Sequence, residues 1–139
     1  MGNREMEVKR IPYESTWNIR HEVMWPGQVI DYVKLPNDKN GSHFGLFVND
    51  KLVSIVSAFI SGEEAQFRKF ATVKEEQGKG YGSKLLTYLM KELTTDRIER
   101  IWCNARVDKT GFYERFGMKK TDRSFSKGGI DYIIMERIA

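Results

Sequence analysis

The sequence is poor in the side chains that form disulfides and metal sites. Among 139 residues it has one cysteine, Cys103, and two histidines, His21 and His43. A single cysteine excludes an internal disulfide and a cysteine-clustered zinc site, and the two histidines lack metal-ligand spacing. Cys103 also stands in an apolar, strand-like run, which favours a buried thiol over a reactive nucleophile. We therefore expect a protein that holds no metal ion.

Long apolar runs and a strong excess of one charge are missing as well. No apolar stretch approaches the roughly 20 residues that cross a bilayer, and the N-terminus has no apolar core of an export signal. The net charge is only +4, and the basic residues are scattered among acids instead of gathered as in nucleic-acid binders. We expect a cytoplasmic protein that binds neither membranes nor nucleic acid.

What is present is typical of one globular domain. Hydrophobic residues make up 40% and charged residues 30% of the chain, a composition that supports a buried core. A length of 139 residues is that of an ordinary domain, and no linker, repeat or low-complexity segment divides it. The sequence predicts a single domain over residues 1–139.

The spacing of apolar residues predicts a mixed α/β (α+β) fold. Helical spacing marks 13–24, 81–93 and 111–116, and residues 26–42 are expected to form a loop with one helical turn at 29–33. β-rich runs between turn residues predict seven strands, at 6–11, 44–48, 52–60, 66–73, 98–104, 118–125 and 130–138. Their order along the chain predicts a mixed, mostly antiparallel sheet flanked by helices.

The most informative segment is the run Gln-Gly-Lys-Gly-Tyr-Gly from Gln77 to Gly82, between a predicted strand and an amphipathic helix. Glycines let the backbone turn sharply and approach a ligand, and the N–H groups that begin a helix attract anions. Lys79 adds a positive charge. A dinucleotide-binding fingerprint would need a glycine at Ser83, and a Walker loop would need Gly-Lys-Ser/Thr after Gly78. The run thus predicts a phosphate-binding turn, with a solvated glycine-rich turn as the alternative.

With a second segment, this run resembles the GNAT superfamily of N-acetyltransferases. The family's pyrophosphate-binding pattern, Gln/Arg-x-x-Gly-x-Gly/Ala, is matched by Gln77, Gly80 and Gly82, and the second segment runs from Asn104 through Tyr113 to Met118. The predicted order of elements also resembles the GNAT fold over nearly the whole chain. The resemblance implies acetyl-CoA as co-substrate. The cofactor-binding residues that it implies are Ala71, Thr72, Val73, Gln77, Gly78, Lys79, Gly80, Tyr81, Gly82, Ser83 and Asn104.

The resemblance implies that the acceptor amine attacks the thioester directly within a ternary complex. Tyr113 is then the general acid, because a phenol with a pKa of about 10 keeps its proton at neutral pH and can protonate the departing thiolate. The backbone at Ala71 to Val73 would pair with the pantetheine arm, and a backbone N–H near Phe70 or Ala71 would stabilise the oxyanion. By position alone, Tyr113 also suits a core residue of a helix, and Asn104 a turn that ends a strand.

A closer likeness exists to the glyphosate N-acetyltransferase subgroup of small bacterial GNAT enzymes. Arginines hold the anionic groups of the substrate in that subgroup, and two of them correspond to Arg68 and Arg106 here. Because arginine forks bind carboxylate or phosphate at two points, we expect a small amine with an anionic group. Surface ion pairing is the alternative for both arginines.

Two other residues depart from that subgroup. Trp25 stands where the subgroup has an arginine, and Tyr132 stands where it has a catalytic histidine. Both are expected to line the acceptor site. The general base stays open between His21, a water chain, and capture of the minor unprotonated form of the amine without a base. A protein N-acetyltransferase and a non-catalytic acyl-CoA-binding regulatory module are the alternative functions. We also expect a homodimer, and this expectation rests on the resemblance alone.

Overall fold

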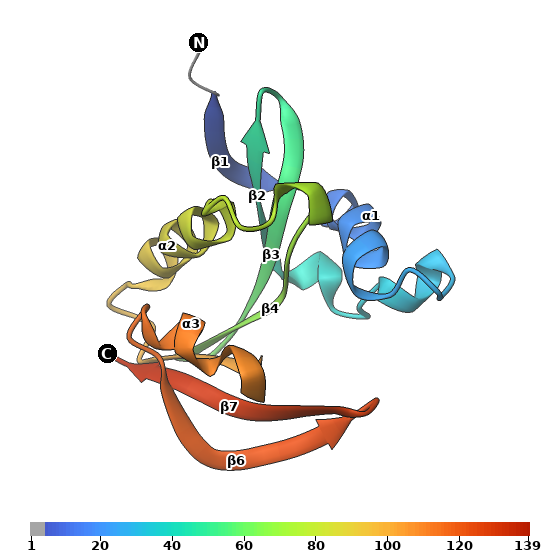
Figure 1. Cartoon of the computed structure of the whole chain (residues 1–139). Coiled ribbons are helices and arrows are strands. Elements are labelled where there is room, and N and C mark those ends of the chain that lie inside the picture. The colour runs from blue at the N-terminus through green and yellow to red at the C-terminus, as the bar shows by residue number, and fades with distance from the viewer. Residues whose placement is uncertain (1–4) are drawn as a thin grey trace.

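In the computed structural model, which describes residues 5–139, seven strands form one twisted sheet with helices on both faces (Figure 1). The strands are β1 (Met6–Ile11), β2 (Ser42–Val48), β3 (Lys51–Ser61), β4 (Glu64–Thr72), β5 (Arg100–Arg106), β6 (Lys119–Lys127) and β7 (Ile130–Ile138). Their order in the sheet is β1-β2-β3-β4-β5-β7-β6, and only β4 and β5 are parallel. The predicted mixed, mostly antiparallel architecture is confirmed. Residues 1–4, part of the segment in which no export signal was expected, lie outside the described residues.

Helix α2 (Tyr81–Leu93) covers one face of β2 to β4, opposite the face that carries α1 (Figure 1). Its inward side chains recur at helical spacing, as predicted, and are Tyr81, Leu85, Leu86, Leu89, Met90 and Leu93. Burial of a side chain of this size contributes roughly 1.5–3 kcal/mol. The helix therefore holds the glycine-rich run, which precedes it, firmly against the end of β4.

The first helical segment differs from the single helix predicted for 13–24. A 3-10 turn, η1 (Tyr13–Thr16), leads into α1 (Trp17–Ile19) and then into a π-helical turn, η2 (Arg20–Met24). The loop at 26–42 contains two more 3-10 turns, η3 (Ile30–Val33) and η4 (Asp38–Asn40), of which only the first was predicted. The wider π turn begins at Arg20, whose side chain is fully buried.

Arg20 and Asp38 form a buried ion pair that ties this loop to the sheet. The guanidinium donates from Nη1 and Nη2 to the two carboxylate oxygens, at 2.9 Å each, and also to Ser57 Oγ of β3 at 3.0 Å. Burial by itself raises the pKa of the Asp38 carboxyl, but hydrogen bonds from Arg20, Leu35 N–H and Trp17 hold it below its ordinary value. The loop is therefore anchored at Asp38.

Candidate active site

Strands β4 and β5 separate part-way along their length. They pair in parallel at Glu64 with Arg100, Ala65 with Ile101, and Gln66 with Trp102, and at no later position. Within the described residues, the β5-facing edge of β4 beyond Gln66 therefore has no neighbouring strand. An unpaired strand edge is a template for an extended ligand, which can bind to it as an added strand. We refer to the V-shaped space between the two strands as the opening.

Tyr113 lies at the narrow end of the opening. It belongs to α3 (Thr110–Glu114), and its ring centroid is 5.9 Å from that of Phe67 in β4. Burial raises the pKa of Tyr113 well above its ordinary value, and Cys103 of β5 adds to this effect. The side chain is thus close to both strands where they separate. Its phenol keeps the proton at neutral pH, which suits a proton donor.

The glycine-rich run lies at the wide end, between β4 and α2. Gly78 and Gly80 have φ of +78° and +83°, in the left-handed region that favours glycine, and a Cβ on either would meet no atom within 4 Å. Helix α2 begins after Gly80 without a side-chain cap. A helix N-terminus that follows such an open turn suits a phosphate group, because its N–H groups and dipole attract anions.

Gly82 is needed for a different reason. A Cβ there would lie 3.0 Å from Cζ of Phe70, because α2 packs closely against β4. Phe70 in turn stacks on Phe112 of α3, with ring centroids 5.8 Å apart. The third glycine of the run thus belongs to the packing that sets the width of the opening.

Two side chains of the run are engaged within the protein. Gln77 Nε2 donates to the Thr72 carbonyl at 2.9 Å, and Lys79 Nζ lies 2.8 Å from the Glu76 carboxylate. Lys79 therefore has its charge partly offset, so the backbone is the part of the run best suited to bind an anion. The Val73 N–H donates to the Val53 carbonyl of β3 at 2.9 Å, so it points away from the opening. Because backbone groups alternate along a strand, the backbone N–H and C=O of the preceding Thr72 point toward the opening.

Arg68 and Arg106 lie on neighbouring strands, as expected, but in different surroundings. Arg68 is half-buried, and within residues 5–139 no carboxylate forms an ion pair with it. Burial lowers its pKa. Arg106 is exposed, and its Nε is 3.6 Å from Oδ1 of Asp108. Among the described residues, Arg68 thus lies near the opening without an ion-pair contact, although the Asp38 charge acts on it, and Arg106 lies in a surface ion pair.

The remaining predicted site residues flank this region. Asn104 is exposed on the face of β5 opposite the buried Cys103, away from Tyr113, and Arg106 pairs with Tyr132 of β7 on that same face. Tyr132 stacks on Phe125 with ring centroids 5.2 Å apart. Trp25 packs edge-on against Tyr32 at 5.1 Å in the loop after η2. Tyr113, the glycine-rich run and the end of β4 come together around the opening.

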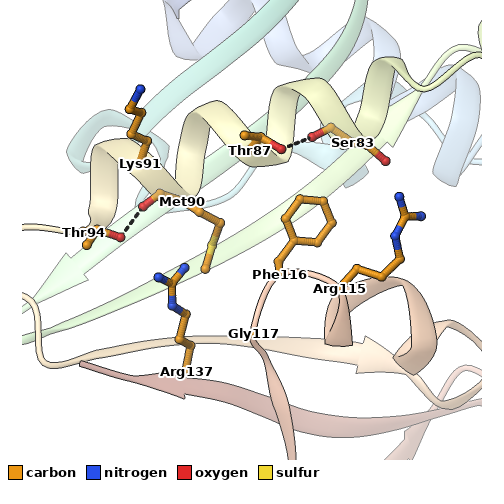
Figure 2. Close-up of a pocket in the computed structure, with 9 residues that line it drawn as sticks. All are labelled: Ser83, Thr87, Met90, Lys91, Thr94, Arg115, Phe116, Gly117 and Arg137. Atoms are coloured by element: carbon orange, nitrogen blue, oxygen red, sulfur yellow. Dashed lines mark hydrogen bonds between the residues drawn. The ribbon is translucent and has the colours of Figure 1, made fainter.

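Arg115 was missed by the sequence analysis. It lines a cavity of about 860 Å³ that begins at the first turn of α2, and Figure 2 shows its guanidinium pointing toward Ser83. The cavity is lined by Ser83, Thr87, Met90, Lys91, Thr94, Arg115, Phe116, Gly117 and Arg137. In sequence, Arg115 stands in the segment that resembles the family, but only the helix packing reveals that it faces α2.

Both histidines form hydrogen bonds within the fold. His43 is buried, with its ring nitrogens hydrogen-bonded to Ser57 Oγ at 2.7 Å and to the Asp38 carbonyl at 2.8 Å. Burial lowers its pKa. His21 Nε2 bonds to the Gln28 carbonyl and stabilises the turn after η2.

The described part of the chain contains no helix long and apolar enough to span a bilayer. Over the same residues, no three His, Cys, Asp or Glu side chains gather into a group that could hold a metal ion.

Comparisons with known proteins agree on one family. A family model described as "Acetyltransferase (GNAT) domain" matches residues 21–139. The chain is also 30% identical, over 140 residues, to the uncharacterized N-acetyltransferase YitI of Bacillus subtilis (strain 168), a match that covers 94% of each chain.

Solved structures agree in fold. A candidate N-acetyltransferase from Lactobacillus plantarum matches with a TM-score of 0.84 and 18% identity, over 96% of this chain and 97% of that one. A GNAT family acetyltransferase from Elizabethkingia anophelis, solved with acetyl-CoA bound, matches with a TM-score of 0.72 and 14% identity, over 96% and 98% of the two chains. At such identities the likeness shows the fold, and the predicted GNAT sheet of seven strands flanked by helices is confirmed.

Proposed function

Because the chain belongs to the GNAT acetyltransferase family and is an acyltransferase, we propose that it moves the acetyl group of acetyl-CoA to the amine of a small anionic acceptor. The family uses acetyl-CoA, and the likeness to the glyphosate N-acetyltransferase subgroup favours an anionic acceptor. The opening between β4 and β5 carries the proposal, with Tyr113 at its narrow end and the glycine-rich run at its wide end. One domain over residues 1–139 would contain the whole site.

The residues around the opening fit the cofactor. The unpaired edge of β4 up to Thr72 suits the amide groups of a pantetheine arm, which can bond to backbone as a strand does. The open space at Gly78 and Gly80, beside the N-terminus of α2, suits a pyrophosphate. Arg115 and Ser83 suit a further phosphate group in the cavity along α2. When bound, acetyl-CoA supplies the thioester that the amine attacks.

The proposed chemistry needs a proton donor, an oxyanion donor and an anchor for the acceptor. Tyr113 would give its proton to the leaving sulfur, and a backbone N–H near Phe70 or Ala71 would stabilise negative charge on the carbonyl oxygen. Arg68 would hold the anionic group of the acceptor. Burial raises the pKa of the Cys103 thiol to about 12, so this buried thiol is a poor nucleophile, in keeping with direct attack by the amine.

The variant Tyr113→Phe tests the mechanism. It removes one hydroxyl and keeps the ring that packs on Phe67 and Phe112. We expect the rate of acetyl transfer to fall by about 10²- to 10⁴-fold. Acetyl-CoA affinity, measured by isothermal titration calorimetry, should not change. A wild-type rate in this variant removes Tyr113 from the mechanism.

A screen of acceptors, followed by release of free CoA, tests the substrate class. Amino acids, aminophosphonates, polyamines and peptides form the panel, and small anionic amines should react best. Turnover of peptides alone would instead indicate a protein N-acetyltransferase. Tight acetyl-CoA binding without turnover of any amine would indicate a regulatory acyl-CoA-binding module.

A further inference from the structure

A second cavity lies on the α1 side of the sheet, beside the narrow end of the opening. Its volume is about 440 Å³, within the range of roughly 300–1,000 Å³ that is typical of sites for small molecules. Its floor is a row of three side chains, Phe59, Gln66 and Trp102, which pair across β3, β4 and β5. Residues directly opposite one another in a sheet share a face, so this row lies on the face away from Phe67 and Tyr113.

The loop before β2 forms one wall of this cavity. Asn37 and Asn40 line the cavity from this loop, on either side of Asp38, whose buried ion pair anchors the loop. A Cβ on Gly41 would lie only 2.5 Å from Cε1 of Phe59, so the loop also packs directly against β3. The fold thus holds both the wall and the floor of the cavity in place.

The lining of the cavity is polar, and its one charge is paired. Among the described residues that line it, only Glu64 is charged, and its carboxylate lies 3.2 Å from Nη1 of Arg100. The carboxamides of Asn37, Asn40 and Gln66 form no hydrogen bond within the described part of the chain. A carboxamide offers donors and an acceptor side by side, which matches a hydroxyl group, since a hydroxyl both donates and accepts. We refer to this site as the amide-lined cavity.

Two aromatic rings beside the carboxamides suit the carbon atoms of the same ligand. Phe59 packs edge-on against His43 with ring centroids 6.0 Å apart, and the guanidinium of Arg100 lies 5.3 Å from the centroid of the Trp102 ring. The apolar atoms of both rings can contact the C–H groups that accompany the hydroxyls of a polyol or sugar. A plain alkyl chain would instead cover the carboxamides and leave them without partners, which costs free energy.

A peptide fits the amide-lined cavity less well than a polyol does. Extended peptides bind by adding a strand to an unpaired edge of a sheet. At the cavity β4 is paired on both sides, since Gln66 pairs with Phe59 of β3 and with Trp102 of β5. Side chains, and not a strand edge, therefore provide the recognition here, which favours a small hydroxylated ligand.

Arg68 lies next to the cavity on the same face of the sheet. It follows Gln66 by two positions in β4, a spacing of about 7 Å along a strand. It is also the last residue of β4 before a bulge, in which Lys69 and Phe70 lie opposite Val56 of β3. One small acceptor can therefore reach both the arginine and the cavity.

We propose that the amide-lined cavity binds the hydroxylated part of the acceptor, so that the substrate is an amine with an anionic group and a polyol or sugar chain. The proposal rests on the proposed function, because it names the acceptor class of the same site. The three carboxamides bind the hydroxyl groups, Phe59 and Trp102 pack against the carbon atoms, and Arg68 binds the anionic group.

Two acceptors that differ only in their hydroxyl groups test this inference. D-norleucine and 2-amino-2-deoxy-D-gluconate have the same carbon chain, α-amine and carboxylate, but only the second bears hydroxyls. We expect kcat/KM to be about 10- to 100-fold higher for the hydroxylated acceptor, which corresponds to a net gain of about two hydrogen bonds. Equal values for the two acceptors would overturn the inference, and their turnover would leave the proposed function standing.

Variants of the lining assign the preference to the amide-lined cavity. Gln66→Leu and Asn40→Leu keep a side chain of similar size and remove its hydrogen-bonding groups, so each should lower the preference by at least about fivefold. Asn18→Leu is the matched control, because Asn18 is exposed on α1 and does not line the cavity. It should keep the wild-type preference. An unchanged preference in both lining variants would place the hydroxyl groups elsewhere and overturn the inference.

Binding of D-gluconate, which has the carboxylate and the hydroxyls but no amine, gives a readout that does not need turnover. Titration calorimetry should detect saturable binding that is at least about fivefold tighter than that of hexanoate and weakens at least about fivefold in Gln66→Leu. No preference for D-gluconate over hexanoate overturns this inference. Saturable D-gluconate binding without turnover of any amine overturns the proposed function and leaves the cavity as a polyol site. Turnover of peptides alone, lost in Gln66→Leu, would overturn the polyol as the occupant and replace it with a peptide.

Discussion

Gln66 and Trp102 form the last pair between β4 and β5, and the two strands separate from this point on. The faces of the sheet differ at the separation. Tyr113 lies on the α3 side with Phe67, whereas Arg68 lies on the α1 side. A thioester held between the strands would thus have the proton donor on one side and the site for the acceptor on the other. Under the proposed function, the acceptor would approach from one face of the sheet, and Tyr113 would donate its proton to the leaving sulfur from the other.

Removal of one partner from the buried ion pair should destabilise the fold strongly. Arg20→Met leaves the Asp38 carboxylate buried without its counter-charge, and we expect a loss of about 3–5 kcal/mol in the free energy of unfolding. Urea denaturation measures it. The double variant Arg20→Met/Asp38→Leu should lose less than the sum of the two single variants.

The control for this prediction is the exposed pair of Lys9 and Glu7, whose charged atoms are 3.8 Å apart. Lys9→Met should change the free energy of unfolding by only about 0–1 kcal/mol. If Arg20→Met behaves in the same way, the loop at 26–42 is held to the sheet by something other than this ion pair.

Lys69→Gly and Lys69→Ala separate backbone strain from the loss of the side chain. Both remove the lysine, but only glycine adopts φ near +57° without strain, so Lys69→Gly should be more stable than Lys69→Ala by about 1–2 kcal/mol. Thermal and urea unfolding measure the difference. Equal stabilities would mean that the bulge shifts to another residue in the variants.

Gly80→Ala should weaken cofactor binding. Gly80 has φ of +83° in the glycine-rich run, and alanine there strains the turn by about 1–2 kcal/mol and shifts the N-terminus of α2. Gly62, with φ of +61° in the β3–β4 turn, offers a matched control. Gly62→Ala should lose similar stability but bind acetyl-CoA as the wild type does. Weakened binding in both variants would point to a general loss of stability.

The seven strands and α2 could be predicted because their pattern is local. The spacing from Tyr81 to Leu93 and the alternation along the strands report burial directly. The break of the first helix at Arg20 could not be predicted, since an arginine in sequence signals exposure, and its burial depends on Asp38, 18 residues away.

The candidate site also contains parts that the sequence predicts and parts that it does not. The glycine-rich run and the segment around Tyr113 are recognisable by residue type and order. The left-handed backbone conformation of Lys69 is not, because a bulge is a property of the register between two strands and leaves no mark in one of them. The same holds for Arg115, which faces the cavity only because α3 packs beside α2.

The short parallel pairing from Glu64 to Gln66 also has a mechanical consequence. It joins two halves of the sheet, β1 to β4 and β5 to β7, and beyond it β4 packs against α3 through the ring pairs Phe67 with Tyr113 and Phe70 with Phe112. An extended ligand in the opening would act as an eighth strand, with hydrogen bonds to the strands on both sides. Under the proposed function, the stability of the fold would then rise with the cofactor concentration in the cell, since a ligand that binds only the folded chain stabilises it in proportion to the logarithm of its concentration.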